Sequence, residues 1–468
     1  MSNSPSKQLL NRSSATGRPS WGSYTAFLLA AIGSSIGLGN VWKFPYELGV
    51  HGGTFLYVYV ACVLLVAFPL IIAELLIGRI GQGNPVASIR AIAKEERKSG
   101  LWEIIGWLGI VTSFLIFSFY SVVASWTLFY IMKSLSGAFV DVPAEIVQNS
   151  FGALLRNADQ QIIWHSVYVL LVVIVLSQGV RSGLERAVRV LMPLFIGFVI
   201  WLALFASEVG DFQRAFEFMT HFEFSEITAE LLVSALSQAL FSLSIGIGIL
   251  IMYGSYLSES RPLFLGAGII MFFDTCIALL MGFIILAIVF SFGMQHDTGP
   301  GLIFETLPVA FAQMTENGIW WSSAFFFLLF VAALTSGFAL LEPSIALLSS
   351  RWSISRRTAA WLVGASAWAL GWVFIYSFSE PTFSFYYFGK ERVRGYFDLF
   401  NILSTHVLLP LTALLIALFA GWRMSKTAAR EALAIRPVLA YRIWRLCIRY
   451  VAPLIITIVL LLVLFFPA

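Results

Sequence analysis

Two short glycine-containing segments have the composition of a site for a cation and a carboxylate. Gly33 to Asn40 reads G-S-S-I-G-L-G-N, and Ser242 to Gly248 reads S-L-S-I-G-I-G, each inside an apolar stretch. Closely spaced glycines weaken a helix by about 1 kcal/mol each, so the backbone can unwind there. Unwound carbonyl oxygens can coordinate a hard cation, and the free N–H groups at the start of a half-helix attract a carboxylate.

Asp274 is a third candidate functional group, because it lies in the middle of the apolar stretch 262–293. A charged side chain at that depth costs several kcal/mol unless it is paired or solvated, and indicates a functional site by default. We expect its carboxylate to bind a cation directly, which would offset the cost of burial. The alternative is a protonated aspartic acid with a structural role.

The sequence does not favour an enzyme. It contains no Ser-His-Asp arrangement, no phosphate-binding loop and no His/Cys spacing typical of a metal site. We therefore expect no catalytic residues. The histidines are scattered and the cysteines lie singly in apolar stretches: His51, His165, His221, His296 and His406, and Cys62, Cys276 and Cys447.

Composition indicates which elements must position these groups. Of the 468 residues, 59% are hydrophobic and only 12% are charged, whereas soluble domains average about 25% charged residues. Most of the surface must therefore face lipid, and the first 20 residues contain no apolar core of a signal peptide. Apolar runs predict eleven membrane spans, at roughly 23–49, 54–78, 101–136, 163–179, 185–207, 229–257, 262–293, 319–349, 358–378, 396–421 and 444–467.

The distribution of basic residues predicts the orientation of these spans. Most of the 29 Lys and Arg residues fall on the side of the N-terminus, in segments such as 79–98, 181–189 and 351–357. By the positive-inside rule the N-terminus is cytoplasmic and the C-terminus lies outside. The basic loop 422–449 is interpreted as a topology determinant, with an anionic-lipid or partner site as the alternative. The net charge of +4 therefore indicates no nucleic-acid partner.

The two glycine-containing segments occupy matching places in two five-span units. They interrupt the first and the sixth span, and an odd number of spans per unit inverts the second copy in the membrane. Paired interruptions of this kind indicate the binding site of a transporter, although glycines can also permit close helix packing. The predicted organisation is a polar cytoplasmic tail (1–22), a first five-helix repeat (23–207), a second repeat (229–421) and an eleventh helix (444–467).

Longer motifs add a resemblance to a known family. The chain contains G-S-S-I-G-L-G-N-V-W-K-F-P-Y, H-G-G-T-F and P-L-I-I-A-E-L-L-I-G-R between Trp21 and Arg79, then F-Y-S-V-V-A-S-W at 119–126, S-Q-A-L-F-S-L-S-I-G-I-G at 237–248 and A-L-T-S-G-F-A-L-L-E-P at 333–343. These motifs resemble the neurotransmitter:sodium symporter family. The resemblance implies an all-α membrane protein of eleven transmembrane helices, with a LeuT-like five-plus-five inverted repeat and broken helices 1 and 6.

The resemblance implies two Na⁺ sites. The first would be formed with the substrate carboxylate and the second from carbonyls and hydroxyls, all of them the oxygen ligands that a hard cation prefers. The matching positions are Ser35, Asn40, Ser242 and Asp274 for the first site, and Gly33, Ile36, Ala332, Thr335 and Ser336 for the second.

The same resemblance bears on chloride. Chloride-dependent relatives have Asn and a hydroxyl where this chain has Asp274 and Ala278. A negative Asp274 would repel Cl⁻, so we expect chloride-independent transport. The remaining positions of the relatives' chloride site match Tyr59, Gln238 and Ser242.

The family's substrate pocket implies a carrier of an amino acid. Monoamine carriers have an Asp where this chain has Gly37, which favours a substrate with its own carboxylate. Several of the pocket positions are apolar, so we expect an aliphatic or aromatic L-amino acid. The matching positions are Ser35, Leu38, Gly39, Ile116, Tyr120, Phe241, Ser242, Ser244, Ile247, Ser336 and Leu340.

The gates depart from the family pattern. Phe241 and Tyr120 match the aromatic lid, but the outer Arg–Asp pair is replaced by Lys43 and Asn401, with Asp398 one turn earlier as a possible substitute. A Lys–Asn bond lacks the bidentate geometry of Arg with a carboxylate. At the inner gate Arg18 and Trp21 match, whereas the expected acid is Ser350.

These observations together predict a Na⁺-coupled symporter that imports an amino acid by alternating access. Its partners would be the amino acid, Na⁺ and the lipid bilayer. The absence of a large glycosylated second outer loop favours a bacterial inner membrane. The alternative is a non-transporting amino-acid sensor on the same fold, which would bind its ligand without moving it.

Overall fold

The computed structural model describes residues 20–139, 142–258, 261–294, 301–313, 317–380, 383–433 and 438–465. Within these ranges the chain is almost wholly helical. The exception is an antiparallel pair of short strands, β1 (Phe385–Tyr387) and β2 (Lys390–Arg392), in which Tyr386 lies opposite Glu391.

The helices of the first half of the chain run from Tyr24 to Glu226. They are α2 (Tyr24–Ser35), η2 (Gly39–Lys43), α3 (Phe44–Cys62), η3 (Val63–Ala67), α4 (Phe68–Gly81), α5 (Pro85–Glu95), η4 (Gly100–Glu103), α6 (Ile104–Leu135), α7 (Ala144–Arg156), α8 (Ala158–Ser177), η5 (Val180–Glu185), α9 (Arg186–Val209), α10 (Phe212–Thr220) and η6 (Phe224–Glu226).

The helices of the second half run from Ala229 to Phe465. They are α11 (Ala229–Ser242), α12 (Ile249–Ser255), α13 (Leu263–Ser291), η7 (Leu302–Thr306), α14 (Leu307–Ala312), α15 (Asn317–Trp352), α16 (Arg356–Ser379), α17 (Gly395–Ile402), η8 (Leu403–Leu408), α18 (Leu409–Leu418), η9 (Phe419–Arg423), α19 (Lys426–Leu433), α20 (Val438–Leu446), η10 (Cys447–Val451) and α21 (Ala452–Phe465).

Nine helical stretches in the described ranges are long and apolar enough to cross a membrane. The sequence predicted eleven spans, and the difference arises at the expected spans 23–49, 54–78 and 229–257. The first and the last of these divide into shorter helices, and 39–81 forms one stretch of 43 residues. Gly52 bends that stretch, because its φ of +68° and ψ of −169° are not helical and a residue with a Cβ rarely adopts them.

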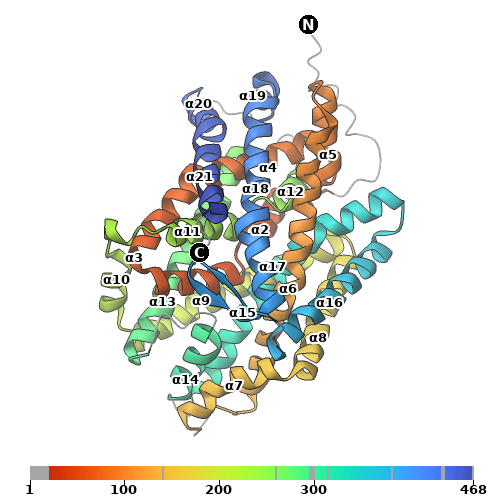
Figure 1. Ribbon diagram of the computed structural model, residues 1–468. Coiled ribbons are helices and arrows are strands. Elements are labelled where there is room, and N and C mark those ends of the chain that lie inside the picture. The colour runs from red at the N-terminus through yellow and green to blue at the C-terminus, as the bar shows by residue number, and fades with distance from the viewer. Residues whose placement is uncertain are drawn as a thin grey trace.

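Packing brings helices from the two halves of the chain together. The long helix α15 lies along α6 and also contacts α2 and α9, while α12 packs on α4 and α11 on α3 (Figure 1). The α4–α12 contact is close enough that a Cβ at Gly78 would overlap the carbonyl of Ile251. Small residues allow such approach of helices in lipid.

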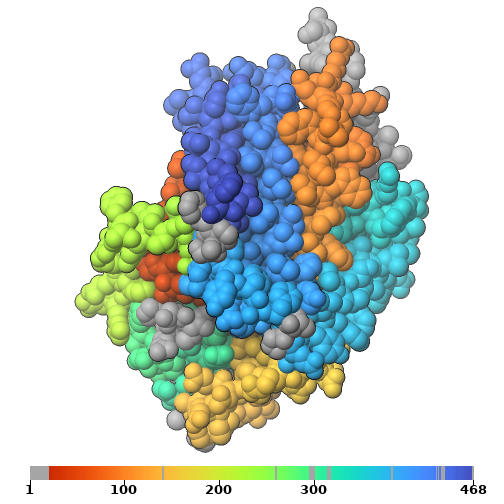
Figure 2. All heavy atoms as spheres, in the orientation of Figure 1, coloured from red at the N-terminus to blue at the C-terminus, as the bar shows by residue number. Residues whose placement is uncertain are grey.

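Three helices with a net positive charge lie at the same end of the molecule. In Figure 1 the basic helices α5, α19 and α20 lie at one end of the molecule, and α7 and α14 lie at the other. Figure 2 shows the C-terminal helices (blue) beside the α5–α6 segment (orange) on one face, in agreement with the packing of α18 against α6 and α21. Basic segments that are far apart in the sequence therefore share one end of the structure.

Candidate functional site

A helix is interrupted inside each glycine-containing segment, at 36–37 in the first and at 243–248 in the second, and the two interruptions meet in the buried interior. Helix α2 ends at Ser35, and Ile36 is extended with φ −76° and ψ 93°. Between α11 and α12 the residues Ser244, Gly246 and Gly248 have φ between +56° and +78°. The Ser244 hydroxyl donates a 3.1 Å hydrogen bond to the carbonyl of Ser34. The two interruptions are thus joined directly.

Three of the positions expected at the first Na⁺ site form one hydrogen-bonded cluster. The Asn40 side-chain amide donates to Asp274 Oδ1 at 2.9 Å, and the Ser242 hydroxyl donates to Asp274 Oδ2 at 2.7 Å. All three side chains are buried. Asn40 Oδ1 is buried as well and has no hydrogen-bond partner among the described residues. An oxygen in this situation fits a cation ligand, because burial without a partner is otherwise costly.

Ser35 lies beside this cluster, but its hydroxyl is turned back into its own helix. It donates to the carbonyl of Ala31 at 2.7 Å. Serine side chains in helices commonly form this bond to the carbonyl one turn earlier. The structure therefore brings Asn40, Ser242 and Asp274 together and leaves the Ser35 hydroxyl engaged elsewhere.

The positions expected at the second Na⁺ site lie where α2 meets α15. A Cβ at Gly33 would be 3.4 Å from Cβ of Thr335, so these two residues are neighbours. The Thr335 hydroxyl donates to the carbonyl of Ala332 at 3.0 Å, and the Ser336 hydroxyl donates to the carbonyl of Ser34 at 3.2 Å. The end of α2, at Gly33 and Ser34, thus lies against Thr335 and Ser336 of α15, and Ile36 is buried just beyond it.

A small cavity of about 20 Å³ lies between these two clusters. Its apolar end is formed by residues such as Ile247 and Leu340, and the Tyr120 hydroxyl accepts a 3.4 Å hydrogen bond from the backbone N–H of Leu38 at its polar end. The residues that line it are Ser34, Ser35, Gly37, Leu38, Gly39, Tyr120, Phe241, Ser242, Ser244, Ile247, Ser336 and Leu340.

The cavity differs from the expected substrate pocket at three positions. Ile116 is buried on α6 but does not line the cavity, whereas Ser34 and Gly37 line it and were not among the expected contact residues. The sequence feature that could have identified Ser34 and Gly37 as lining residues is their position in the first glycine-containing segment. Ser34 and Gly37 line the cavity because of the path that the backbone takes at the end of α2. The spacing of the motif alone does not specify this path.

The positions that match the relatives' chloride site are also buried near Asp274. Gln238 donates from its side-chain amide to the carbonyl of Gly39 at 2.7 Å, and Tyr59 packs against Phe44. Ala278 is buried on α13, one helical turn after Asp274. The side chain at position 278 therefore offers no hydroxyl donor to an anion.

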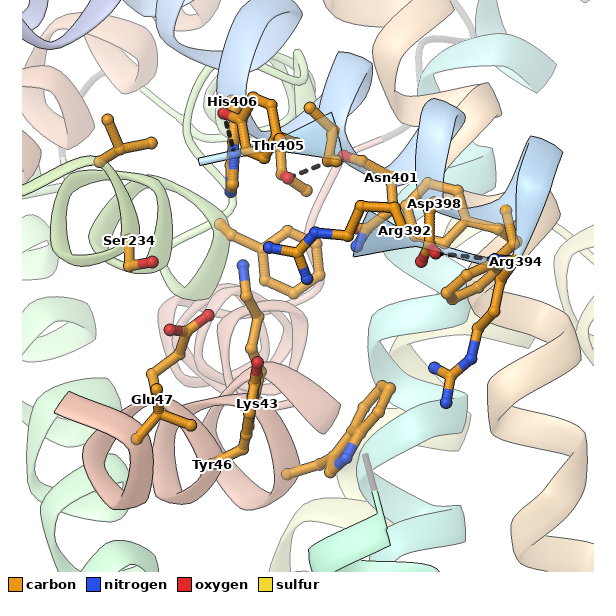
Figure 3. Close-up of a pocket in the computed structure, with 18 of the residues that line it drawn as sticks. Lys43, Tyr46, Glu47, Ser234, Arg392, Arg394, Asp398, Asn401, Thr405 and His406 are labelled. Carbon is orange, nitrogen blue, oxygen red and sulfur yellow. Dashed lines mark hydrogen bonds between the residues drawn. The ribbon is translucent and has the colours of Figure 1, made fainter. Parts of the chain in front are cut away.

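A second, larger cavity of about 180 Å³ has Phe241 in its lining, as the first cavity does. Figure 3 shows the charged and polar residues that line it. Lys43 and Asn401 both line it, but they form no hydrogen bond with each other in the described structure. The Lys43 ammonium instead lies 5.2 Å from the centre of the Phe241 ring. Asp398 does not take the place of the missing acid, because its carboxylate accepts from the backbone N–H of Arg394 at 3.0 Å.

At the opposite end, Trp21 closes the molecule against α12. Its backbone N–H donates to the carbonyl of Tyr256 at 3.2 Å, and its indole N–H donates to the carbonyl of Tyr253 at 3.1 Å. Arg18, the other expected residue of this gate, lies outside the described residues. Ser350 accepts a hydrogen bond from the Asn84 amide at 2.8 Å.

Two buried carboxylates support the interrupted helices. Glu74 on α4 accepts a 2.7 Å hydrogen bond from the backbone N–H of Gly246, so it satisfies a donor that the missing helical turn leaves free. Glu342 on α15 pairs with Arg356 and accepts from the Tyr256 hydroxyl at 2.8 Å. Both carboxylates are fully buried, and both act on backbone or packing rather than on the cavity.

The cavity lies between two clusters of oxygen atoms at unwound segments, inside a bundle of apolar helices. This arrangement is typical of a membrane carrier for an ion and a small solute. Comparison with known proteins identifies the family. The model of the "Sodium:neurotransmitter symporter family" matches residues 18–151 and 155–467, which is most of the chain. The protein belongs to this family, and its members are transporters rather than enzymes.

Individual relatives agree with this assignment. The chain is 33% identical over 446 residues to an uncharacterized sodium-dependent transporter, YhdH, of Bacillus subtilis, covering 94% of this chain and 96% of the relative. It is 30% identical over 450 residues to an uncharacterized sodium-dependent transporter of Haemophilus influenzae, covering 94% and 97%. The crystal structure of MhsT in complex with L-phenylalanine superimposes with a TM-score of 0.88 at 34% identity, over 95% of this chain and 99% of MhsT.

The chain is thus a sodium-dependent, multi-pass membrane transporter with a LeuT-like fold. The prediction from the sequence motifs is confirmed for the family, for the use of Na⁺ and for the transporter class.

Proposed function

We propose that the protein couples the inward movement of two Na⁺ to the uptake of an apolar L-amino acid, by alternating access and without chloride. The observation that carries the proposal is the setting of Asp274. Its buried carboxylate is held by Asn40 and Ser242, and among the described residues it forms no ion pair. A bound cation would compensate the cost of burying this charge.

The cavity chemistry supports an amino-acid substrate. The backbone N–H of Leu38 and the Tyr120 hydroxyl lie at one end, and free N–H groups at an unwound helix favour a carboxylate. At the other end, Phe241, Ile247 and Leu340 offer apolar contact. The likeness to MhsT in complex with L-phenylalanine supports an aliphatic or aromatic side chain.

The substrate also supplies the coupling. Its carboxylate would complete the shell of the first Na⁺ beside Asn40 and Asp274, so that neither binds well without the other. The second Na⁺ would be held between Gly33 and Ile36 of the first segment and Ala332, Thr335 and Ser336 of α15. This ion would join the end of α2 to α15 and stabilise the state in which the inner side is closed.

The proposal includes the eleven-helix arrangement with two inverted five-helix repeats, and helices 1 and 6 broken at the glycine-containing segments. The shorter helices α2 and α11, which are apolar but do not reach spanning length, support the broken arrangement. The basic ends of α5, α19 and α20 lie together in Figure 1 and support a cytoplasmic N-terminus in a bacterial inner membrane, with the C-terminus outside.

Uptake of radiolabelled amino acids into proteoliposomes tests the proposal. With an inward Na⁺ gradient we expect accumulation of an apolar L-amino acid above the external concentration, and with K⁺ in place of Na⁺ we expect none. Binding of the amino acid without accumulation would instead indicate a sensor on the same fold.

Chloride independence has its own test. Replacing external and internal chloride by gluconate is expected to leave the initial rate of uptake unchanged, because Asp274 provides the negative charge next to the first Na⁺. A rate that falls several-fold in gluconate, and recovers with added chloride, would contradict the role given to Asp274.

Gly37 offers a test of the cavity. A Cβ at this position would overlap the Ser336 hydroxyl and lie 3.2 Å from the Tyr120 hydroxyl. Gly37→Ala is therefore expected to raise the substrate concentration for half-maximal uptake at least about 10-fold, the equivalent of about 1.4 kcal/mol. Gly268→Ala is the matched control, since a Cβ there meets nothing within 4 Å. Equal effects of the two substitutions would exclude the cavity as the substrate site.

A further inference from the structure

The three residues before the N-cap of α2, which are Ser20, Trp21 and Gly22, are hydrogen-bonded to η5 and to the C-terminal end of α12. Arg181 on η5 donates to the carbonyl of Ser20 at 2.8 Å and to its hydroxyl at 2.9 Å. Trp21 donates to the carbonyl of Tyr253 on α12 and to that of Tyr256, the C-cap of the same helix. The third residue, Gly22, donates its backbone N–H to Glu185 Oε2 at 2.9 Å.

Glu185 is well placed to hold this end of α2. Its side chain is only 5% exposed, and its second oxygen pairs with Arg189 at 2.6 Å. The carboxylate therefore lies between α9 and the start of α2, where Ser23 is the N-cap. A negative charge at a helix N-terminus interacts favourably with the helix dipole. Helix α2 has no acidic residue in its own first turn, so Glu185 provides that charge from another element.

Gly22 permits the contact because it has no side chain. A Cβ at Gly22 would lie 2.7 Å from Glu185 Oε1 and 3.4 Å from the carboxyl carbon. Any larger residue would therefore displace the carboxylate. The pair can thus be disrupted from either partner, which offers two independent variants with the same expected consequence.

We propose that Arg181 and Glu185, acting on Ser20 and Gly22, form an inner latch that holds α2 closed against the cytoplasmic side. This inference rests on the alternating-access function proposed above. The latch uses an acid on η5, whereas position 350 on α15, where the acid of the family's inner gate is expected, is a serine. Opening to the cytoplasm requires the start of α2 to leave α12 and η5, so the latch must break at that step. Glu185 is a positioning residue here, because it does not line the cavity.

Hydrogen exchange measured by mass spectrometry on the purified full-length protein, with Na⁺ present, tests the latch. Glu185→Ala is expected to speed exchange of the amides of residues 22–27 about 10-fold, as loss of a hydrogen bond to a charged group allows. Glu185→Gln keeps an acceptor for the Gly22 N–H without the charge, so a smaller acceleration is expected. Gly22→Ala is expected to match Glu185→Ala.

Two comparisons separate a latch from general stabilisation. Arg189→Gln removes the ion pair between Glu185 on η5 and Arg189 on α9. It leaves the bond to Gly22, so it is expected to leave exchange at 22–27 unchanged. In the double variant Gly22→Ala with Glu185→Ala, the acceleration is expected to equal that of either single variant, because both remove one interaction. The exchange of α6 and α15 is expected to stay as in the wild type.

Several results would overturn the latch. These are unchanged exchange at 22–27 in Glu185→Ala, an equal effect of Arg189→Gln, additive effects in the double variant, or faster exchange throughout the helices. Uptake by the wild-type protein tests the transport function separately. Wild-type protein that fails to accumulate substrate would refute the transport proposal, and with it a gating role for the latch, even where the exchange pattern is as expected.

Discussion

Replacing Asp274 by alanine is expected to abolish Na⁺-driven uptake. The substitution removes the negative charge of the first Na⁺ site. It leaves the Ser242 hydroxyl without its acceptor, and the Asn40 amide keeps only its bond to the backbone carbonyl of residue 274. Two opposite unit charges about 4 Å apart attract each other by about 4 kcal/mol at an effective dielectric constant near 20, and a carboxylate that coordinates Na⁺ directly lies no farther away than this. This corresponds to a loss of about three orders of magnitude in Na⁺ affinity, which a Na⁺ titration of uptake and of substrate binding would reveal.

Asp274→Asn separates the charge from the hydrogen bonds. The amide of asparagine is close in shape to the carboxylate and retains an oxygen acceptor, so we expect normal folding and a large fall in Na⁺ affinity. Asp159→Asn, on the exposed first turn of α8, is the control for a simple change of net charge and is expected to have no effect. Wild-type Na⁺ dependence in both Asp274 variants would refute the assignment of this carboxylate as a ligand.

Removal of the Glu342 carboxylate is expected to have the largest effect on stability. Glu342 is fully buried, and it pairs with Arg356, whose side chain is 22% exposed. Breaking a buried ion pair by deleting one partner costs about 3–5 kcal/mol, because the remaining charge is left without compensation. Glu342→Ala also leaves the Tyr256 hydroxyl without its acceptor. We expect the midpoint of thermal unfolding in detergent to fall by at least about 5 °C.

The pair of Arg90 and Glu103 provides the control for that prediction. Its side chains are 50% and 33% exposed, and ion pairs of this kind contribute about 0–1 kcal/mol. Glu103→Gln is therefore expected to shift the midpoint by about 1 °C or less. Similar shifts for Glu342→Ala and Glu103→Gln would mean that the buried pair adds no stability beyond that of an exposed pair.

The helical stretches and their composition follow from the sequence alone. Hydropathy is a local property, so the predicted span 262–293 corresponds to helix Leu263–Ser291 and the span 358–378 to helix Arg356–Ser379. The glycine-containing segments could also be located, because glycine acts on the backbone where it stands. The count of spans could not be fixed in this way. It depends on how the chain bends at Gly52 and on where α2 and α11 end, and both are set by packing.

The family motifs also placed the oxygen-bearing residues in two groups. Asn40 and Asp274 are 234 residues apart in the sequence. Only the resemblance to relatives predicted that they belong to one site. Nothing in the spacing of the chain itself brings them together. Their contact requires the packing of α13 against η2.

Other features were decided by the tertiary structure alone. The Lys43 ammonium lies over the Phe241 ring rather than against Asn401, Gly37 lines the small cavity whereas Ile116 does not, and Glu185 reaches the start of α2. Each of these features depends on which elements of the fold lie next to one another. Sequence determines where a helix forms and which side chains it carries, whereas the partner that each side chain meets depends on how the helices pack, since the bonds are short and directional.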